Sequence, residues 1–150
     1  QYSRLVHLCL NNKTLLMKTK HFAIGLILLT AILTSGSLPQ SANGIIDSVS
    51  SAFKEGSSSK IAKHFNSTIE MQLLEEENMF SKAQAEMLLK DFFSKYTPTS
   101  FKVNHQGTKG NTSFAIGTLI TKSGIFRVSI FIKSENDKML IHQLRIEASE

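Results

Sequence analysis

Residues 101–147, the C-terminal third of the chain, alternate apolar and polar side chains in four consecutive stretches. A period of two is typical of β-strands that bury one face, and short turns separate the four stretches. The sequence therefore predicts a four-stranded antiparallel meander, whose two middle strands are apolar on parts of both faces and are expected to be the most covered. The positions expected to point inward come from among Phe114, Ile116, Phe126, Val128, His142 and Leu144.

One helix is predicted directly before this sheet, over Ser81–Tyr96. Ser81 stands three residues before Gln84, which is the spacing of a capping box, where each side chain satisfies the other residue's free backbone N–H. Thr97-Pro98 ends the helix, because the residue before a proline is displaced from the α region. Good helix formers lie between these signals, with an apolar stripe at Ala85, Leu88, Leu89 and Phe92.

The segment before this helix carries weaker signals for two short helices and a hairpin. Gly56 is placed to end the first helix in a left-handed conformation. The predicted elements are a helix over Asn43–Glu55, a short helix after Ser57–Ser59 that buries Ile61, Ala62 and Phe65, a strand over Ser67–Leu74, a turn over Glu75–Asn78 and a very short strand at Met79–Phe80.

The N-terminal region has the order of a secretory signal peptide. Basic residues at Met17–His21 precede an apolar run at Phe22–Leu33, and small residues at Ser35–Ser37 follow. The run is shorter than the roughly 20 residues that span a bilayer, which favours cleavage over the alternative of an uncleaved anchor. We expect a signal peptide over 17–42, cleaved between Ser37 and Ala42, and an exported domain, periplasmic or secreted, over 43–150 with no membrane span. Residues 1–16 are interpreted as an upstream stretch outside the fold.

Charge and cysteine content exclude several classes of function. The chain has 17 basic and 12 acidic side chains; four of the basic and none of the acidic ones precede residue 43, which leaves 13 against 12 in the predicted domain. Such a balance does not favour a nucleic-acid partner. The single cysteine, Cys9, also lies upstream, so the domain has no thiol for a disulfide, a nucleophile or a metal site. We expect no cofactor and no metal.

Several motifs resemble an uncharacterised bacterial exported domain family of the nuclear-transport-factor-two-like, or cystatin-like, superfamily. The resemblance covers Ile45–Glu147 and implies an α+β fold in which N-terminal helices pack on a strongly curved antiparallel sheet to form a cone. The implied order is helix, helix, short hairpin, helix and four-stranded meander, and the family implies no activity. The motifs are Ser81–Glu86 with Lys90–Phe93, then Ile116–Leu119, Phe126–Val128 and Gln143–Glu147.

The open end of such a cone can hold a ligand, and five residues are candidates to bind it. Arg127 and Arg145 have the same parity on adjacent strands, so they could converge on an anionic ligand, although ion pairs with acidic neighbours explain them equally well. His142 and His105 could point inward, where a packed, hydrogen-bonded ring is the commoner role. Tyr96 ends the long helix and could cover the pocket. No catalytic residue is predicted.

Three functions follow from this sequence. The first is a non-catalytic module that binds an unknown small ligand or a protein partner through the cavity or the sheet face. The second is a metal-independent pocket enzyme of the isomerase, dehydratase or hydrolase kind, whose acid–base groups would come from His64, His105, His142, Asp91 and Tyr96. The third is a structural envelope protein that forms a homodimer through the outer sheet face, with Phe131 and Ile141 exposed there.

Overall fold

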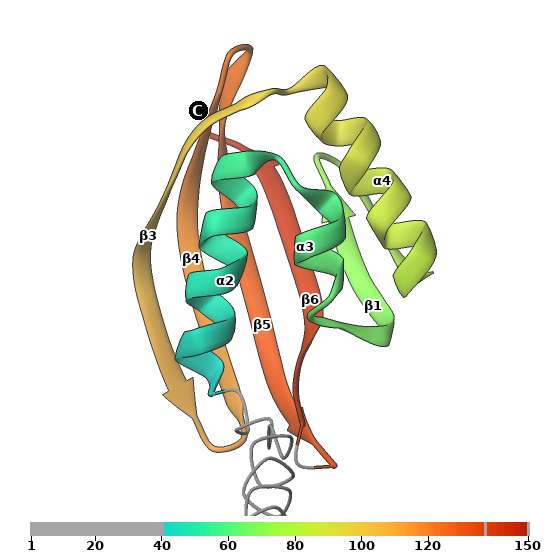
Figure 1. Cartoon of the computed structure of the whole chain (residues 1–150), viewed down its shortest axis with the longest axis vertical. Coiled ribbons are helices and arrows are strands. Elements are labelled where there is room, and N and C mark those ends of the chain that lie inside the picture. The colour runs from blue at the N-terminus through green and yellow to red at the C-terminus, as the bar shows by residue number, and fades with distance from the viewer. Residues whose placement is uncertain (1–40, 137, 150) are drawn as a thin grey trace, which may run out of the picture. The chain divides into compact units, whose positions relative to one another are not determined.

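The computed structural model describes residues 41–136 and 138–149, so the predicted leader lies outside the described residues except for Ser41 and Ala42. Three helices lie against one face of a single curved sheet (Figure 1). None of the helices in the described ranges is long and apolar enough to cross a membrane. In chain order the elements are α2 (Ala42–Glu55), α3 (Ser58–Ala62), β1 (Phe65–Leu73), β2 (Glu76–Ser81), α4 (Lys82–Lys95), β3 (Pro98–Lys109), β4 (Thr112–Thr121), β5 (Gly124–Glu135) and β6 (Lys138–Ala148).

The helices begin and end where the local sequence signals predict. The Ser81 side chain accepts a hydrogen bond from the Gln84 backbone N–H, and the Gln84 side chain accepts one from the Ser81 N–H, so the predicted capping box of α4 is confirmed. Gly56 follows α2 with φ of 65°, the left-handed conformation that glycine adopts at least cost. Phe65, however, belongs to β1 and not to the second helix, which is only five residues long.

The β1–β2 hairpin is tighter than the sequence predicts. Its turn consists of Leu74 and Glu75, and Leu74 has a φ of 59°. Residues Glu76–Asn78, predicted as a turn, are instead paired with β1 as part of the six-residue strand β2. Three consecutive acidic residues favour a solvated turn from composition alone, but only Glu75 lies in the turn. Glu76 and Glu77 lie on an exposed edge strand, where their side chains stay in water.

The sheet has six strands in the order β2-β1-β6-β5-β4-β3. The predicted antiparallel meander forms β3 to β6, and β1 adds to it in parallel alongside β6. As a result β5 and β6 occupy the centre of the sheet, whereas the alternation alone predicted β4 and β5. The last strand would have been an edge of the isolated meander, and the hairpin made by β1 and β2 covers it.

A β-bulge in β6 puts Ile141 on the opposite face of the sheet from the one that was predicted. The register with β5 shifts between Phe131 and Ile132, where His142 is the extra residue. Ile141 is therefore fully buried, and the prediction that it is exposed on the outer face is wrong. His142 is half-buried and does not belong to the core that contains Leu144 and Ile146. One added residue changes the face of every side chain on one side of the bulge.

Strand β4 turns the opposite set of its side chains to the core from the set that the sequence suggested. Ala115 and Leu119 are buried in the core, together with the small Gly117 between them. Phe114 and Ile116 are only half-buried and are absent from the described hydrophobic core. They lie on the outer face, away from the helices, because both faces of this strand are apolar and the alternation does not tell which one the helices cover.

Aromatic rings fill the space between helices and sheet. Phe53 of α2 stacks on Phe101 of β3, with ring centroids 4.9 Å apart. Phe53 also meets the ring of Phe93 edge-on, with ring centroids 5.8 Å apart. Phe93 in turn contacts Phe92, which reaches Phe126 of β5 at 5.2 Å. The described interior of the cone between α2, α4 and β3 is thus packed with aromatic side chains.

Candidate functional site

A pocket of about 1060 Å³ lies at the open end of the fold, where four segments that are distant in sequence meet. These segments are the β1–β2 turn at 73–76, the last two turns of α4, the β4–β5 turn at 123–126 and the end of β6 at 147–149. The volume is at the upper end of the roughly 300–1000 Å³ that is typical of small-molecule sites. No single stretch of the sequence encloses this pocket.

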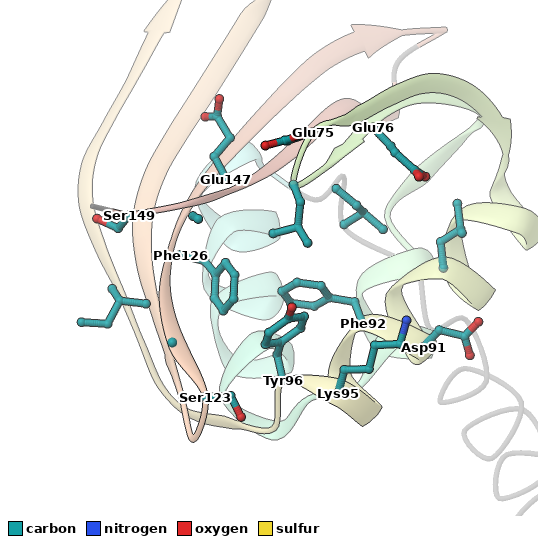
Figure 2. Close-up of a pocket in the computed structure, with 16 residues that line it drawn as sticks. Glu75, Glu76, Asp91, Phe92, Lys95, Tyr96, Ser123, Phe126, Glu147 and Ser149 are labelled. Atoms are coloured by element: carbon teal, nitrogen blue, oxygen red, sulfur yellow. The ribbon is translucent and has the colours of Figure 1, made fainter.

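Three aromatic side chains form the inner wall of the pocket. The ring of Tyr96 lies 4.9 Å from the rings of both Phe92 and Phe126, and Phe92 meets Phe126 edge-on at 5.2 Å. Figure 2 shows the three rings grouped together in the middle of the site. Phe92 and Phe126 are nearly buried, whereas Tyr96 is half-buried. The wall is therefore held rigidly by the core, and leucine and isoleucine side chains extend it at Leu73, Leu74, Leu88 and Ile125.

Charged side chains surround this apolar wall, and most of them are acidic. Glu75, Glu76 and Glu147 lie together on one side of the rings, while Asp91 and Lys95 lie on the other (Figure 2). Four carboxylates thus line the pocket against one ammonium group. Among the described residues, no ion pair involves any of these five side chains.

Only one of the five predicted ligand-binding residues lines this pocket. Tyr96 does so, at the C-terminal end of α4 as the sequence suggested. Arg127 is exposed, and its register partner on β6 is Glu147. Arg127 and Arg145 do lie on the same face of adjacent strands, as predicted, two residues apart in register. This face of the sheet points away from the helices, so neither arginine reaches the pocket.

Arg145 belongs to a polar network that joins three strands. Its Nη2 donates to Glu77 Oε1 of β2 at 2.7 Å and lies 3.4 Å from Glu70 Oε1 of β1. The Gln143 amide also donates to Glu70. This hydrogen bond lowers the pKa of the Glu70 carboxyl, and the Arg145 guanidinium lowers that pKa further. Arg145 thus ties the outer β1–β2 hairpin to β6.

The three described histidines lie away from the pocket. His142 Nδ1 is 3.4 Å from Asn66 Nδ2, and its Nε2 is 3.4 Å from Glu135 Oε2, which suits a structural pairing at the β6 bulge. His105 is exposed on β3. His64 is half-buried after α3, where burial, and then the ammonium groups of Lys82 and Lys63, lower its pKa.

Of the remaining lining residues, only Asp91 was named in advance as a site residue, as a possible acid–base group of a pocket enzyme. Phe92 and Phe126 were recognised only as apolar positions of a helix and a strand, while the acidic Glu75 and Glu76 were interpreted as a solvated turn. Apolar side chains next to turns, at Leu74 and Ile125, are the one signal in the sequence that could have indicated an apolar surface there. Within the described ranges no three histidine, cysteine or acidic side chains are grouped as metal ligands.

Comparison with known proteins identifies both the family and the fold. The model of the DUF4783 family, a domain of unknown function, matches residues 46–147. A DUF4783 protein from Bacteroides ovatus is 37% identical with a TM-score of 0.66, over 69% of this chain and 94% of that chain. A DUF4783 protein from Bacteroides uniformis is 36% identical with a TM-score of 0.67, over 69% of this chain and 96% of that chain.

A more distant structure shows the fold alone. A protein named Rd1NTF2_04 with long sheet is 18% identical, with a TM-score of 0.57, over 71% of this chain and 99% of that chain. The expected α+β cone of the nuclear-transport-factor-two-like kind is therefore confirmed. Curated proteins offer no match to the chain.

Proposed function

The chain belongs to the DUF4783 family, whose function is unknown, and we propose that its domain is a non-catalytic binding module for a small ligand with an apolar body. The observation that carries this proposal is the pocket of about 1060 Å³ whose inner wall is the Phe92, Tyr96 and Phe126 cluster. Burying an apolar ligand surface against such rings is favourable at about 25 cal/mol per Å². The packed core holds two of the rings in place, so little ordering is needed upon binding.

The composition of the pocket favours binding over acid–base catalysis. General acid–base chemistry needs two titratable groups within reach of one substrate atom. Of the five acid–base candidates, Asp91 and Tyr96 line the pocket and the three histidines do not. In the described part of the chain no side-chain hydrogen bond joins two titratable lining groups. The apolar wall, in contrast, is continuous with the core. An enzyme of the isomerase, dehydratase or hydrolase kind is therefore the weaker alternative.

Octanol, a neutral probe with an apolar tail, tests this function. We expect a titration of the purified protein, followed by NMR, to shift the aromatic signals of Tyr96 and Phe126.

Tyr96→Ala should weaken octanol binding about threefold to tenfold, because an aromatic contact contributes about 0.5–1.5 kcal/mol beyond its area. Leu88→Trp, which fills the pocket, should do the same. Met87→Ala is the matched control, since Met87 is 65% exposed on the same helix and lies outside the lining. No shift with any octyl probe would refute the proposal.

A second candidate role is self-association through the outer sheet face. Phe114, Ile116 and Phe131 form an outer apolar cluster: Phe114 and Phe131 are direct cross-strand partners on β4 and β5, and none of the three belongs to the described core. Arg127 and Glu147 are cross-strand partners on the same outer face, at one end of the cluster. A second copy of the chain, related by a two-fold axis, would cover the cluster. We propose this second copy as the occupant of the face.

A further inference from the structure

The charges around the pocket restrict the chemistry of what it can hold. Its lining contains one basic and four acidic side chains, on three separate elements: Glu75 and Glu76 on the β1–β2 hairpin, Asp91 and Lys95 on α4, and Glu147 on β6. Asp91 and Lys95 are one helical turn apart, a spacing at which opposite charges attract and offset each other. Glu75 and Glu76 remain on the other side of the aromatic wall (Figure 2), and Glu147 reaches the rim of the pocket from the outer face of β6, where Arg127 is its cross-strand neighbour.

These carboxylates differ from the acidic residues nearby that have a partner. Glu70 and Glu77 are both held by Arg145, so their charge is compensated within the sheet. No described basic side chain lies within ion-pair distance of Glu75, Glu76 or Glu147. Arg127 is the cross-strand register partner of Glu147, but the two do not form an ion pair. Glu75 and Glu76 therefore give the pocket mouth an uncompensated negative charge beside an apolar wall.

An anionic ligand would be repelled at this mouth, and a neutral one would use the wall alone. A ligand with an ammonium group on an apolar body uses both features. Its body packs on Phe92, Tyr96 and Phe126, and its positive charge is attracted by the carboxylates. The half-buried ring of Tyr96 adds a cation–π attraction, which contributes about 0.5–1 kcal/mol at an exposed site.

We propose that the pocket at the open end of this domain takes a small organic cation, an ammonium group attached to an apolar body. This inference rests on the proposed binding function and names its ligand class. It also replaces the anionic ligand that the arginine pair suggested, because Arg127 and Arg145 lie outside the lining and Arg145 already binds two carboxylates.

Three probes with the same tail and different head groups provide the test: octylammonium, octanol and octanoate, each titrated at low ionic strength below its aggregation limit. We expect octylammonium to bind about threefold to thirtyfold more tightly than octanol, and octanoate to bind most weakly, because two or three partly exposed charge pairs act together. Added salt should weaken only octylammonium binding, since it screens exposed charges.

Charge-removing variants locate the effect. Glu75→Gln combined with Glu76→Gln should weaken octylammonium binding about threefold to tenfold and leave octanol binding within about twofold. Glu147→Gln should have a smaller effect, because Glu147 lies beside Arg127 on the outer face of β6. The matched control is Asp47→Asn combined with Glu86→Gln, which removes the same total charge from residues outside the lining and should leave both affinities unchanged.

The outcomes separate this inference from the function on which it rests. If octanol or octanoate binds at least as tightly as octylammonium, the cation is excluded while the binding function stands. If the control pair weakens octylammonium as much as the Glu75 and Glu76 pair does, the effect is one of net charge and the assigned mouth is wrong. If none of the three probes binds, both proposals fail together.

Discussion

At the scale of single residues, close packing determines which side chains the sheet tolerates. Gly117 of β4 lies on the inner face beneath the ring of Phe101. A Cβ at this position would stand 2.6 Å from Phe101 Cζ and 2.8 Å from the carbonyl oxygen of Lys102. Because one of these atoms belongs to the backbone, the space cannot be made by a side-chain rotation. The absent side chain is what lets Phe101 stack on Phe53.

Gly117→Ala should therefore lower the free energy of unfolding by about 1–3 kcal/mol, the usual cost of overpacking a core. The matched control is Gly124→Ala, where the nearest atom to the new Cβ is Phe126 Cζ at 3.5 Å, an ordinary contact. We expect that variant to stay within about 0.5 kcal/mol of the wild type. Urea unfolding of the three proteins measures the difference, and equal midpoints would contradict the packing argument.

At the scale of elements, the best-predicted one is α4, whose start is set by local hydrogen bonds. The Ser81–Gln84 capping box needs only residues three apart, so the sequence alone contains it. The faces of β4 and β6 are not set locally in this way. Strand β4 has apolar residues on both faces, and β6 contains a bulge that shifts its alternation. Which of their faces is outward depends on where the helices pack. The outer apolar cluster of Phe114, Ile116 and Phe131 is a consequence of that packing.

If a second copy covers this cluster, its disruption should dissociate the protein. We expect wild-type protein to sediment as a dimer at the concentrations used for NMR, and Phe131→Lys to sediment as a monomer, because a charge buried in an apolar interface is costly. Met87→Lys, which places the same charge on an exposed position of α4, should remain dimeric. A wild type that is monomeric at every accessible concentration would rule out the self-association.

At the scale of the whole molecule, the last residues of the predicted leader, Ser41 and Ala42, are also the first residues of the described domain. The Ser41 hydroxyl accepts a hydrogen bond from the Gly44 N–H at 3.2 Å and so caps α2. Cleavage after Ala42 would remove this cap, which typically stabilises a helix by about 1 kcal/mol. Cleavage after Ser37 would keep it. Within the predicted cleavage window, the domain therefore favours the end at Ser37.

We propose that the protein is exported and cleaved there, so that the mature chain begins at Leu38. Expression of the full chain in a bacterial host, followed by intact-mass measurement on the periplasmic and secreted fractions, reads the new terminus directly. A mature chain that starts at Asn43 would show that the cap does not restrict cleavage. Recovery of only uncleaved protein in the membrane fraction would instead support the uncleaved anchor.

From residue patterns alone we could predict the order of helices and strands, the ends of α2 and α4, the meander of β3–β6 and the inward set of β5. These features depend on short-range signals, namely alternation, caps and turns, which nearby residues contain completely. Packing between elements determines instead that β1 pairs with β6, that Ile141 is buried and Phe114 is not, and that Tyr96 is the one residue of the five predicted ligand-binding residues to line the pocket. The physical reason is the same in each case: four segments far apart in the chain form the pocket, and the choice of covered face is made by packing between elements.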